Sequence, residues 1–192
     1  IYDFEVIKQI RKTCLDNKLP LHLDGARVFN SFEETKIPFH EYGAQFDSIS
    51  ICLSKGLGAP VGSLLLGTKD FINKATRIRK VYGGGMRQAG FIAAAGIYAL
   101  DNNLKRLSED HKHAIILEEE LNSLDWVAEI MPVESNILIL TLKDSVSRDE
   151  IISKLTDEGV LVSAFGPQMI RFVTHLDISE SDPPHTHVTL GQ

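Results

Sequence analysis

A lysine at the end of a strand-like segment constrains the fold of this chain more than any other feature. Lys55 lies in the run SKGLGAP at residues 54–60, directly after an apolar segment at residues 48–53. An amine that follows a strand and enters a glycine turn is presented at the carboxyl edge of a sheet, where open α/β sheets bind cofactors. The glycines let the backbone turn tightly beside a bulky group. The sequence therefore predicts an α/β fold with Lys55 at a cofactor site.

A second strand-like segment, at residues 21–24, ends in a carboxylate. Asp24 is its last residue, and Arg27 follows three positions later. A lysine and an aspartate at strand ends are what pyridoxal phosphate chemistry requires. The lysine forms a Schiff base with the aldehyde, and the aspartate keeps the pyridine nitrogen protonated so that the ring accepts electrons. We therefore expect Asp24 and Lys55 to converge on one cofactor.

Each of these residues also has a structural interpretation. An isolated Asp-Gly pair is usually a turn or a helix cap, but an unpaired carboxylate is costly to bury at the end of an apolar strand, and a pyridinium would be the partner of Asp24. His22 shares a strand face with Asp24 and either orients that carboxylate or is a structural histidine. A nucleotide-binding P-loop does not fit Lys55, because the lysine precedes the glycines.

Four segments of the chain resemble motifs of the L-threonine aldolases, in the same order. They are LHLDGARVFN at residues 21–30, SKGLGAPVGS at 54–63, YGGGMRQAG at 82–90 and IRFVTHLDIS at 170–179. The resemblance extends over residues 1–179. It implies a pyridoxal-phosphate lyase that splits a small β-hydroxy amino acid, typically L-threonine or L-allo-threonine, into glycine and acetaldehyde.

The resemblance also implies roles for individual arginines, whose guanidinium groups suit carboxylates and phosphates. Arg171 would bind the substrate carboxylate, and Arg27 the phenolic oxygen of the cofactor or the same carboxylate. Arg87 would reach a phosphate, in one arrangement across the subunit boundary of a homodimer or homotetramer with a shared active site. A surface ion pair is the structural alternative for each arginine. The implied cofactor-binding residues are Lys55, Asp24, Arg27, His22, Ser54 and Arg87.

The fold that the resemblance implies is the C-terminal part of an aspartate-aminotransferase-like, type I pyridoxal-phosphate fold. Residues 1–102 would form part of the cofactor-binding major domain, with a sheet that is incomplete at its N-terminus. Residues 103–192 would form a connecting helix and a small α+β domain, with an atypical tail at residues 180–192. We therefore expect one α/β unit and one α+β unit.

Two other functions remain open. A serine hydroxymethyltransferase-like enzyme or another type I lyase would use the same lysine and aspartate, but the run GGGMRQAG favours an aldolase. A catalytically incomplete fragment that acts as a structural or interaction partner is the second alternative. Family members carry a preceding segment with a Gly-Thr loop for the phosphate and a histidine that stacks on the pyridine ring. We therefore expect the 192 residues alone to bind cofactor weakly, turn over threonine negligibly and self-associate.

Composition narrows the partners and the compartment. The net charge of −6 disfavours nucleic acid, because no basic patch is available to displace phosphate counterions. No apolar run reaches the length of about 18 residues that a membrane helix needs. Cys14 and Cys52, interpreted as buried small side chains, suit a reducing compartment such as the cytoplasm. We expect no metal site, because His111 and His113 are two positions apart on a helix and point to different faces; His185 and His187 lie in the tail.

The apolar periodicity predicts the order of the elements. Helices are expected at about residues 3–17, 38–43, 68–82, 86–102, 104–124 and 147–158. Strands are expected at 21–24, 46–53, 61–66, 127–131, 137–142, 160–165 and 169–173. The first three strands are predicted to be buried, and the third to run antiparallel to the second because the turn between them is too short for a helical crossover. Two small-residue stripes on the helix at 86–102 (89/93/97 and 90/94/98) are expected to pack closely.

Overall fold

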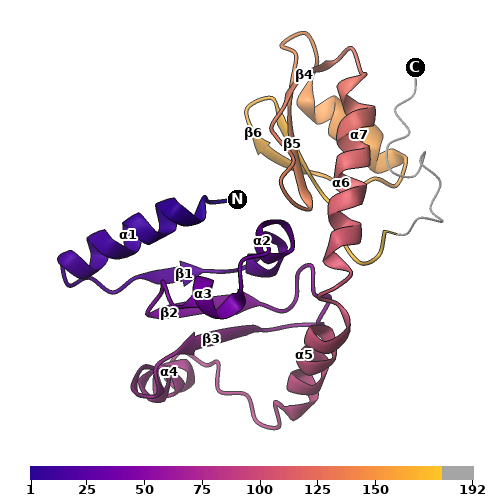
Figure 1. Ribbon diagram of the computed structural model, residues 1–192. Coiled ribbons are helices and arrows are strands. Elements are labelled where there is room, and N and C mark those ends of the chain that lie inside the picture. The colour runs from indigo at the N-terminus through magenta and orange to yellow at the C-terminus, as the bar shows by residue number, and fades with distance from the viewer. Residues whose placement is uncertain (179–192) are drawn as a thin grey trace. The chain divides into compact units, whose positions relative to one another are not determined.

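The computed structural model describes residues 1–178 and divides the chain into two compact units (Figure 1). Unit 1 is Ile1–Lys105 and unit 2 is Arg106–Gln192. The tail at 180–192, with His185 and His187, lies outside the described residues. Each unit contains its own sheet, so each can be described by itself.

Unit 1 is built on a three-stranded sheet with the order β1-β2-β3. Strand β1 pairs with β2 in parallel, and β2 pairs with β3 antiparallel, as the short connection predicts. The elements in chain order are α1 Phe4–Asp16, β1 His22–Asp24, α2 Val28–Thr35, α3 Phe39–Gly43, β2 Ser48–Cys52, β3 Ser63–Gly67, α4 Lys69–Val81 and α5 Gly90–Asn102. Figure 1 shows α1 and α2 near β1 and α4 near β3.

The core of unit 1 lies on one face of this sheet. Ile7, Val28, Tyr42 and Ile51 are buried there, and they come from α1, α2, α3 and β2 respectively. Leu23 of β1 packs against the same cluster. Helices α1–α3 therefore cover the face of β1 and β2 that carries the apolar side chains.

The prediction that β1 and β3 are buried strands is wrong. His22 and Asp24 are exposed because side chains alternate along a strand, and these two point away from the face that carries Leu23. All five residues of β3 are exposed, including Leu64, Leu65 and Leu66. An apolar run can indicate a strand, but its burial depends on what packs against it.

Two helix predictions also need correction. The segment after Arg27 forms α2, which the periodicity did not predict and which ends at Lys36, a residue with a left-handed φ of 55°. Helix α5 begins at Gly90 and not at residue 86, because Gln88 has a φ of 54° and a right-handed helix cannot run through such a residue. The helix expected at 68–82 is confirmed as α4, and the side chain of Thr68 caps its start by accepting a hydrogen bond from the N–H of Phe71.

The predicted packing stripes of α5 are wrong as well. Ile97 and Tyr98 are 62% and 65% exposed, whereas Gly96 and Ala99 are buried. An added Cβ at Gly90 would meet no atom within 4 Å, so that position is open. Small residues occur all around this helix, and their spacing alone could not identify the face that packs.

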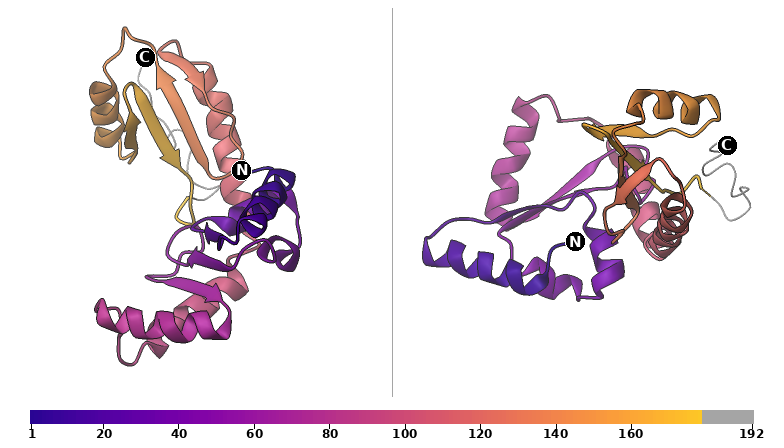
Figure 2. Two further views of the ribbon diagram at one scale, coloured as in Figure 1. Left: turned by 90° about the vertical axis from the view of Figure 1, so that its left-hand side faces the viewer. Right: turned by 90° about the horizontal axis from the view of Figure 1, so that it is seen from above.

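Unit 2 is a four-stranded antiparallel sheet with the order β4-β5-β7-β6, covered on one face by two helices (Figure 2). Its elements are α6 Leu107–Asn122, β4 Val127–Ile130, β5 Ile137–Leu142, α7 Arg148–Asp157, β6 Ser163–Gly166 and β7 Met169–Val173. Nine buried side chains of α6, α7, β5 and β7 form its core. The predicted order of helices and strands is confirmed in this unit, although α6 and β6 begin three residues later than expected.

Candidate active site

Asp24 and Lys55 lie at the same edge of the sheet in unit 1. Asp24 is the last residue of β1, and Lys55 follows the end of β2 by three positions. The two strands are adjacent and parallel, with Asp24 paired to Ser50, so their carboxyl ends point the same way. The two residues that are expected to share one cofactor therefore lie at or just after neighbouring strand ends.

The local structure around Asp24 depends on the glycine that follows it. The N–H of Gly25 donates to the carbonyl of Ser50 at 2.8 Å, and an added Cβ at Gly25 would lie 2.8 Å from that same oxygen. No other residue fits this close approach without a backbone shift. The Asp24 carboxylate accepts a hydrogen bond from the N–H of Ala26 at 3.2 Å and is otherwise open. Because Asp24 is exposed, the expected cost of its burial does not arise.

His22 and Ser54 lie close to these two residues in the sequence, and the structure places them differently. His22 Nδ1 is hydrogen-bonded to Ser48 Oγ at 2.8 Å, between residues that are paired in the β1–β2 ladder. This contact corresponds to the structural role of His22. Ser54 is exposed beside Lys55, and neither side chain has a hydrogen bond or an ion pair among residues 1–178.

The loop that carries Lys55 is held by its neighbours and not by regular structure. Within it, the N–H of Gly58 donates to the carbonyl of Lys55 at 2.8 Å, and Gly58 itself has a φ of 69°. Leu57 is only 3% exposed, so the loop is anchored by a buried side chain two residues after the lysine. The exposed amine therefore stands on a loop whose base is fixed.

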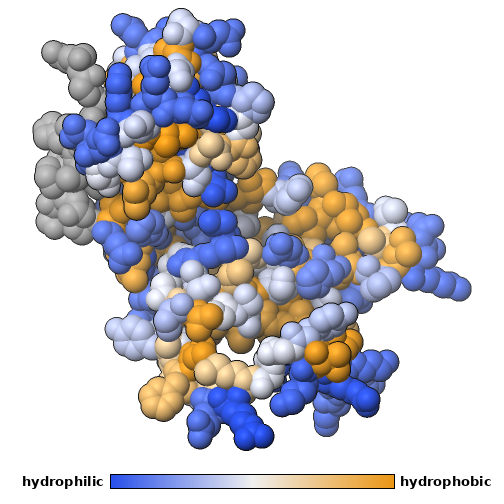
Figure 3. Space-filling model, turned by 180° about the vertical axis from the view of Figure 1, so that it is seen from behind, coloured by the Kyte–Doolittle hydropathy of each residue, from blue (hydrophilic) through white to orange (hydrophobic). Residues whose placement is uncertain are grey.

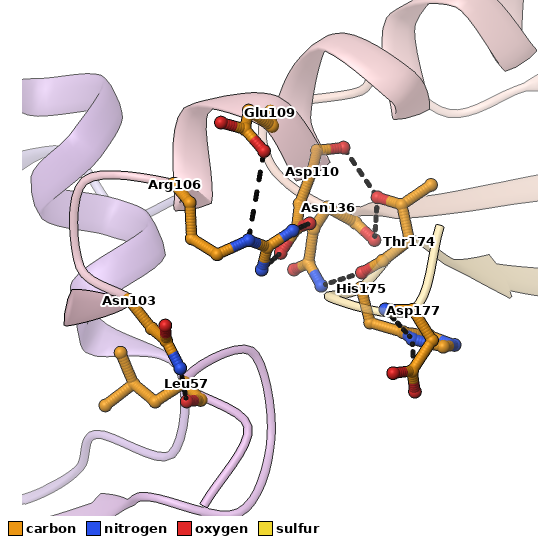
Figure 4. A network of polar contacts seen from close by, with 9 residues as sticks. All are labelled: Leu57, Asn103, Arg106, Glu109, Asp110, Asn136, Thr174, His175 and Asp177. Carbon is orange, nitrogen blue, oxygen red and sulfur yellow. Dashed lines mark hydrogen bonds and ion pairs between the residues drawn. The ribbon is translucent and has the colours of Figure 1, made fainter. Parts of the chain in front are cut away.

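Helix α5 supplies a contact to this loop that sequence reasoning missed. The Asn103 side chain donates to the carbonyl of Leu57 at 2.7 Å, across 46 positions of sequence (Figure 4). An added Cβ at Gly96 would lie 2.9 Å from Leu53 Cδ1, at the start of the loop. No local pattern indicates either contact, because the partners meet only in the folded unit.

The two arginines of unit 1 occupy different environments. Arg27 is half-buried at the N-cap position of α2, three residues after Asp24. Arg87 is exposed in the turn before α5 and has no hydrogen bond or ion pair within the described part of the chain. In the sequence, Arg27 therefore lies close to the strand end that carries Asp24. The guanidinium of Arg87 is free to bind a group other than the described residues.

Arg171 belongs to unit 2, in the middle of β7. Its neighbours Ile170 and Phe172 are 0% and 4% exposed in the core, so Arg171 points to the opposite face of the sheet, as the alternation predicts. Its guanidinium carbon lies 5.9 Å from the centroid of the Phe165 ring. Its Nε atom is buried and has no hydrogen-bond partner among residues 1–178. A buried donor without an acceptor favours the binding of an anion.

Unit 2 also contains a buried polar network that no sequence motif indicates (Figure 4). The Asp110 side chain is fully buried and is paired with Arg106 at 2.7 Å. Burial raises the pKa of Asp110, and the hydrogen bond from Arg106 offsets only part of that effect. Thr174 Oγ1 donates to the carbonyl of Asp110 at 2.6 Å, and the Asn136 side chain donates to the carbonyl of Thr174 at 2.8 Å. These bonds fasten the end of β7 to the first turn of α6.

No group of three or more potential metal ligands occurs among the described residues, including His111 and His113. Within residues 1–178, no helix has the length and apolar character needed to cross a bilayer. Cys14 and Cys52 are free, and each is half-buried, so the expectation of fully buried thiols is wrong.

Comparison with known proteins identifies the family. The family model described as beta-eliminating lyase matches residues 1–145, which include both strand ends, Asp24 and Lys55. The chain belongs to the beta-eliminating lyase family. The likeness that the four sequence motifs indicated is thereby confirmed at the level of the family.

Relatives and solved structures extend this result to the fold. The low specificity L-threonine aldolase of Escherichia coli K12 is 42% identical over 91% of this lyase-family chain and 51% of its own length. A threonine aldolase structure from Leishmania major has a TM-score of 0.78 at 21% identity, covering 97% of this chain and 54% of its own. The histidinol-phosphate aminotransferase structure from Clostridium acetobutylicum has a TM-score of 0.66 at 14% identity. The match covers 92% of this chain and 55% of the aminotransferase chain.

These structures confirm the predicted fold class, an α/β fold of the aspartate-aminotransferase type. The chain spans about half the length of the curated relatives that it matches. Within that half lie the segments with Asp24, Lys55, Arg87 and Arg171.

Proposed function

We propose that this chain takes part in the pyridoxal-phosphate-dependent aldol cleavage of L-threonine and L-allo-threonine to glycine and acetaldehyde. The observation that carries the proposal is the placement of Asp24 and Lys55 at the carboxyl ends of adjacent parallel strands. The 42% identity to a protein named low specificity L-threonine aldolase supports the choice of substrate. A small β-hydroxy amino acid is therefore the proposed ligand.

The residues present fit pyridoxal phosphate. Lys55 offers an exposed amine on an anchored loop, and Asp24 offers an exposed carboxylate whose hydrogen bond from the N–H of Ala26 leaves oxygen lone pairs free for a protonated ring nitrogen. When bound, the cofactor supplies an aldehyde for the lysine amine and a ring that takes up the electron pair of the cleaved bond. Arg87, exposed and unpaired among residues 1–178, is a candidate for the phosphate.

Each residue has a distinct part in the proposed chemistry. Lys55 would hold the cofactor through its amine, and Asp24 would keep a proton on the ring nitrogen. Arg171 binds the substrate carboxylate through its guanidinium, which positions the bond to be broken. Arg27 is proposed to contact the phenolic oxygen of the cofactor or the same carboxylate. His22 supports the cofactor strand through Ser48, and Ser54 lies beside the lysine.

We propose further that the protein acts as a homo-oligomer, a dimer or a tetramer, in which Arg87 reaches the cofactor phosphate of a neighbouring subunit. The exposed position of Arg87 before α5 supports this arrangement. The free thiols of Cys14 and Cys52 fit a reducing location such as the cytoplasm.

One observation favours a second function, that of a structural or interaction partner without catalysis of its own. Many large apolar side chains of unit 1 are exposed, and hydrophobic surface is visible in Figure 3. Phe91 is 90% exposed and Tyr82 is 86% exposed. Exposed apolar surface of this extent is characteristic of protein–protein contact. The two functions differ in whether the chain itself turns over threonine.

The experiment that tests the proposal is a product assay with the purified chain completed by the N-terminal segment of a full-length relative, added in cis or as a separate chain, because the 192 residues alone are expected to turn over threonine negligibly. Incubation with pyridoxal phosphate and L-threonine is expected to yield glycine and acetaldehyde in equal amounts, with L-allo-threonine as a second substrate. L-Serine serves as the control for a hydroxymethyltransferase-like activity. Absence of glycine at saturating cofactor, with a folded chain by circular dichroism, would contradict the proposal and favour the interaction partner.

A further inference from the structure

We infer that Asn103, at the end of α5, is a positioning residue for Lys55, acting through its hydrogen bond to the carbonyl of Leu57. This inference rests on the proposed role of Lys55 as the residue that attaches the cofactor. Asn103 touches neither Lys55 nor a proposed cofactor contact; it holds the loop on which the lysine stands. The effect would therefore be on where the amine is presented, and not on the chemistry of the amine.

The loop has few other constraints. Between β2 and β3, residues 53–62 form no ladder, and their backbone is fixed by three hydrogen bonds: Leu53 N–H to Gly62 O, Ala59 N–H to Leu53 O, and Gly58 N–H to Lys55 O. The first two bonds connect Leu53, at the start of the loop, with Gly62 and Ala59 later in the same loop. The third closes the turn after Lys55. The bond from Asn103 is the one side-chain hydrogen bond that these residues receive within the described chain. This bond also connects the loop to another element of unit 1, the end of helix α5.

The Asn103 bond acts on the part of the loop that is buried. Leu57 is 3% exposed and Ala59 is 7% exposed, whereas Lys55 is exposed. Removal of the Asn103 amide would leave the carbonyl of a buried residue without its side-chain donor, which costs free energy. The loop can recover that loss by moving the carbonyl toward water, and Lys55, two residues away, moves with it.

Gly96 provides a second, independent contact of the same helix with the same loop. An added Cβ at this position would lie 2.9 Å from Leu53 Cδ1, a buried side chain at the start of the loop. The helix can therefore approach the loop closely only because residue 96 has no side chain. Asn103 and Gly96 lie on the buried side of α5, two turns apart, so the helix contacts both the start and the middle of the loop.

The test measures how selectively Lys55 reacts with pyridoxal phosphate. The lysine amine condenses with the aldehyde with loss of water, and borohydride then reduces the product to a stable secondary amine. Peptide mass spectrometry gives the modified fraction of Lys55 and, in the same sample, of Lys74, an exposed lysine of α4 without an ion pair in the described chain. At limiting cofactor, the ratio of the modified fraction of Lys55 to that of Lys74 depends on how the Lys55 amine is positioned. A change that alters the reactivity of both lysines equally cancels in this ratio.

Asn103→Asp is expected to lower the Lys55 to Lys74 ratio about tenfold, because it removes the donor and places a carboxylate against the Leu57 carbonyl. Asn102→Asp is the matched control: it makes the same change one residue away, where the side chain bonds only to Tyr98 O of its own helix. Its ratio should equal that of the wild type. An Asn103→Asp variant with a lower melting temperature and an unchanged ratio, measured well below that temperature, would overturn the inference and leave Asn103 a structural residue.

A second pair of variants decides the question if Asn103→Asp does not fold. Gly96→Ala should lower the Lys55 to Lys74 ratio about threefold, because the added methyl group displaces Leu53. A threefold change corresponds to about 0.7 kcal/mol. Gly90→Ala adds the same methyl group to the same helix in open space and should leave the ratio unchanged. Equal ratios in both variants would overturn the inference. A wild-type chain that modifies Lys55 no more than Lys74 would instead contradict the proposed function.

Discussion

Unit 2 closes its own hydrophobic core, whereas unit 1 leaves much of its apolar surface exposed. In unit 2, nine side chains of 8% exposure or less lie between one face of the sheet and two helices. In unit 1 the corresponding cluster has four, and most of the large apolar side chains that are exposed in the described chain belong to this unit. Unit 2 thus carries Arg171, the residue proposed to bind the substrate carboxylate, on a sheet with a closed core, and unit 1 carries most of the residues proposed to hold the cofactor.

The same contrast appears in two aspartate–arginine pairs. In unit 1, Asp47 is paired with Arg11 at 2.7 Å on the surface, and the hydrogen bond from Arg11 lowers the pKa of Asp47. In unit 2, Asp110 is paired with Arg106 at the same distance but is fully buried, and burial raises its pKa. The two ion pairs have equal N···O distances and opposite pKa shifts, because Asp110 is desolvated by burial, whereas Asp47 stays near water and also accepts a hydrogen bond from the N–H of Leu21.

The largest effect is expected at Lys55. Lys55→Ala should abolish glycine production and lower total bound cofactor to the level of scattered surface lysines, because Lys55 follows β2 at the sheet edge of Asp24. Lys69 also follows a strand, but β3 runs antiparallel to β2 and ends at the opposite edge. Lys74→Ala is the matched control on α4 and should retain both. The measurements are glycine release and cofactor content per chain. Retained turnover in Lys55→Ala would show that the reactive amine lies elsewhere.

Truncation of matched leucines compares the two units directly. Leu140→Ala, at a fully buried position of β5, should lower the free energy of unfolding by about 2–5 kcal/mol. Leu65→Ala, at a 41% exposed position of β3, should change it by less than about 0.5 kcal/mol. Urea denaturation measures both. A large loss for Leu65→Ala would mean that β3 is covered in solution, for example by self-association.

Arg171→Ala should raise the KM for L-threonine about ten- to a hundredfold, while the attachment of cofactor at Lys55 is unchanged. A charge-assisted hydrogen bond to a carboxylate contributes about 1.5–3 kcal/mol, and tenfold in affinity corresponds to 1.4 kcal/mol. Steady-state kinetics and borohydride trapping give the two quantities. An unchanged KM would move the carboxylate site to Arg27.

The smallest effects are expected in the pH dependence of stability. Because the pKa of Asp110 is raised above its ordinary value of 3.8, its contribution to stability is present below that value and is lost as pH rises through the raised pKa. The pKa of Asp47 is lowered, so its contribution is present above 3.8 and is lost as pH falls through the lowered pKa.

Two variants test this opposition by urea denaturation across pH. Asp110→Asn should gain stability relative to the wild type as pH rises from 3.8 toward neutrality, whatever constant cost the loss of the Arg106 pair imposes. Asp47→Asn should lose stability relative to the wild type as pH rises from the lowered pKa of Asp47 to about 3.8, and should change little above that pH. Parallel pH profiles for the two variants would contradict the contrast between the buried and the surface pair.

The sequence predicted elements where the local pattern carries the information. The strand β5 was predictable because ILILTL at 137–142 is a short apolar run, but the letters do not show that positions 138, 140 and 142 are the buried ones. The lysine and aspartate at strand ends were identifiable for the same reason. The prediction that β3 is buried was wrong. An apolar run indicates that its side chains favour burial, but it does not show whether another element of the fold covers them. The contacts of Asn103 with Leu57 and of Thr174 with Asp110 join positions 46 and 64 residues apart, and no local pattern records them.

A crystal structure of the borohydride-reduced chain tests the central claim most directly. The account predicts the phosphopyridoxyl group on Nζ of Lys55, with its ring nitrogen within hydrogen-bond distance of the Asp24 carboxylate, about 2.7–3.2 Å. A group on another lysine, or a ring nitrogen that faces a residue other than Asp24, would contradict the assignment of these two strand ends to one cofactor.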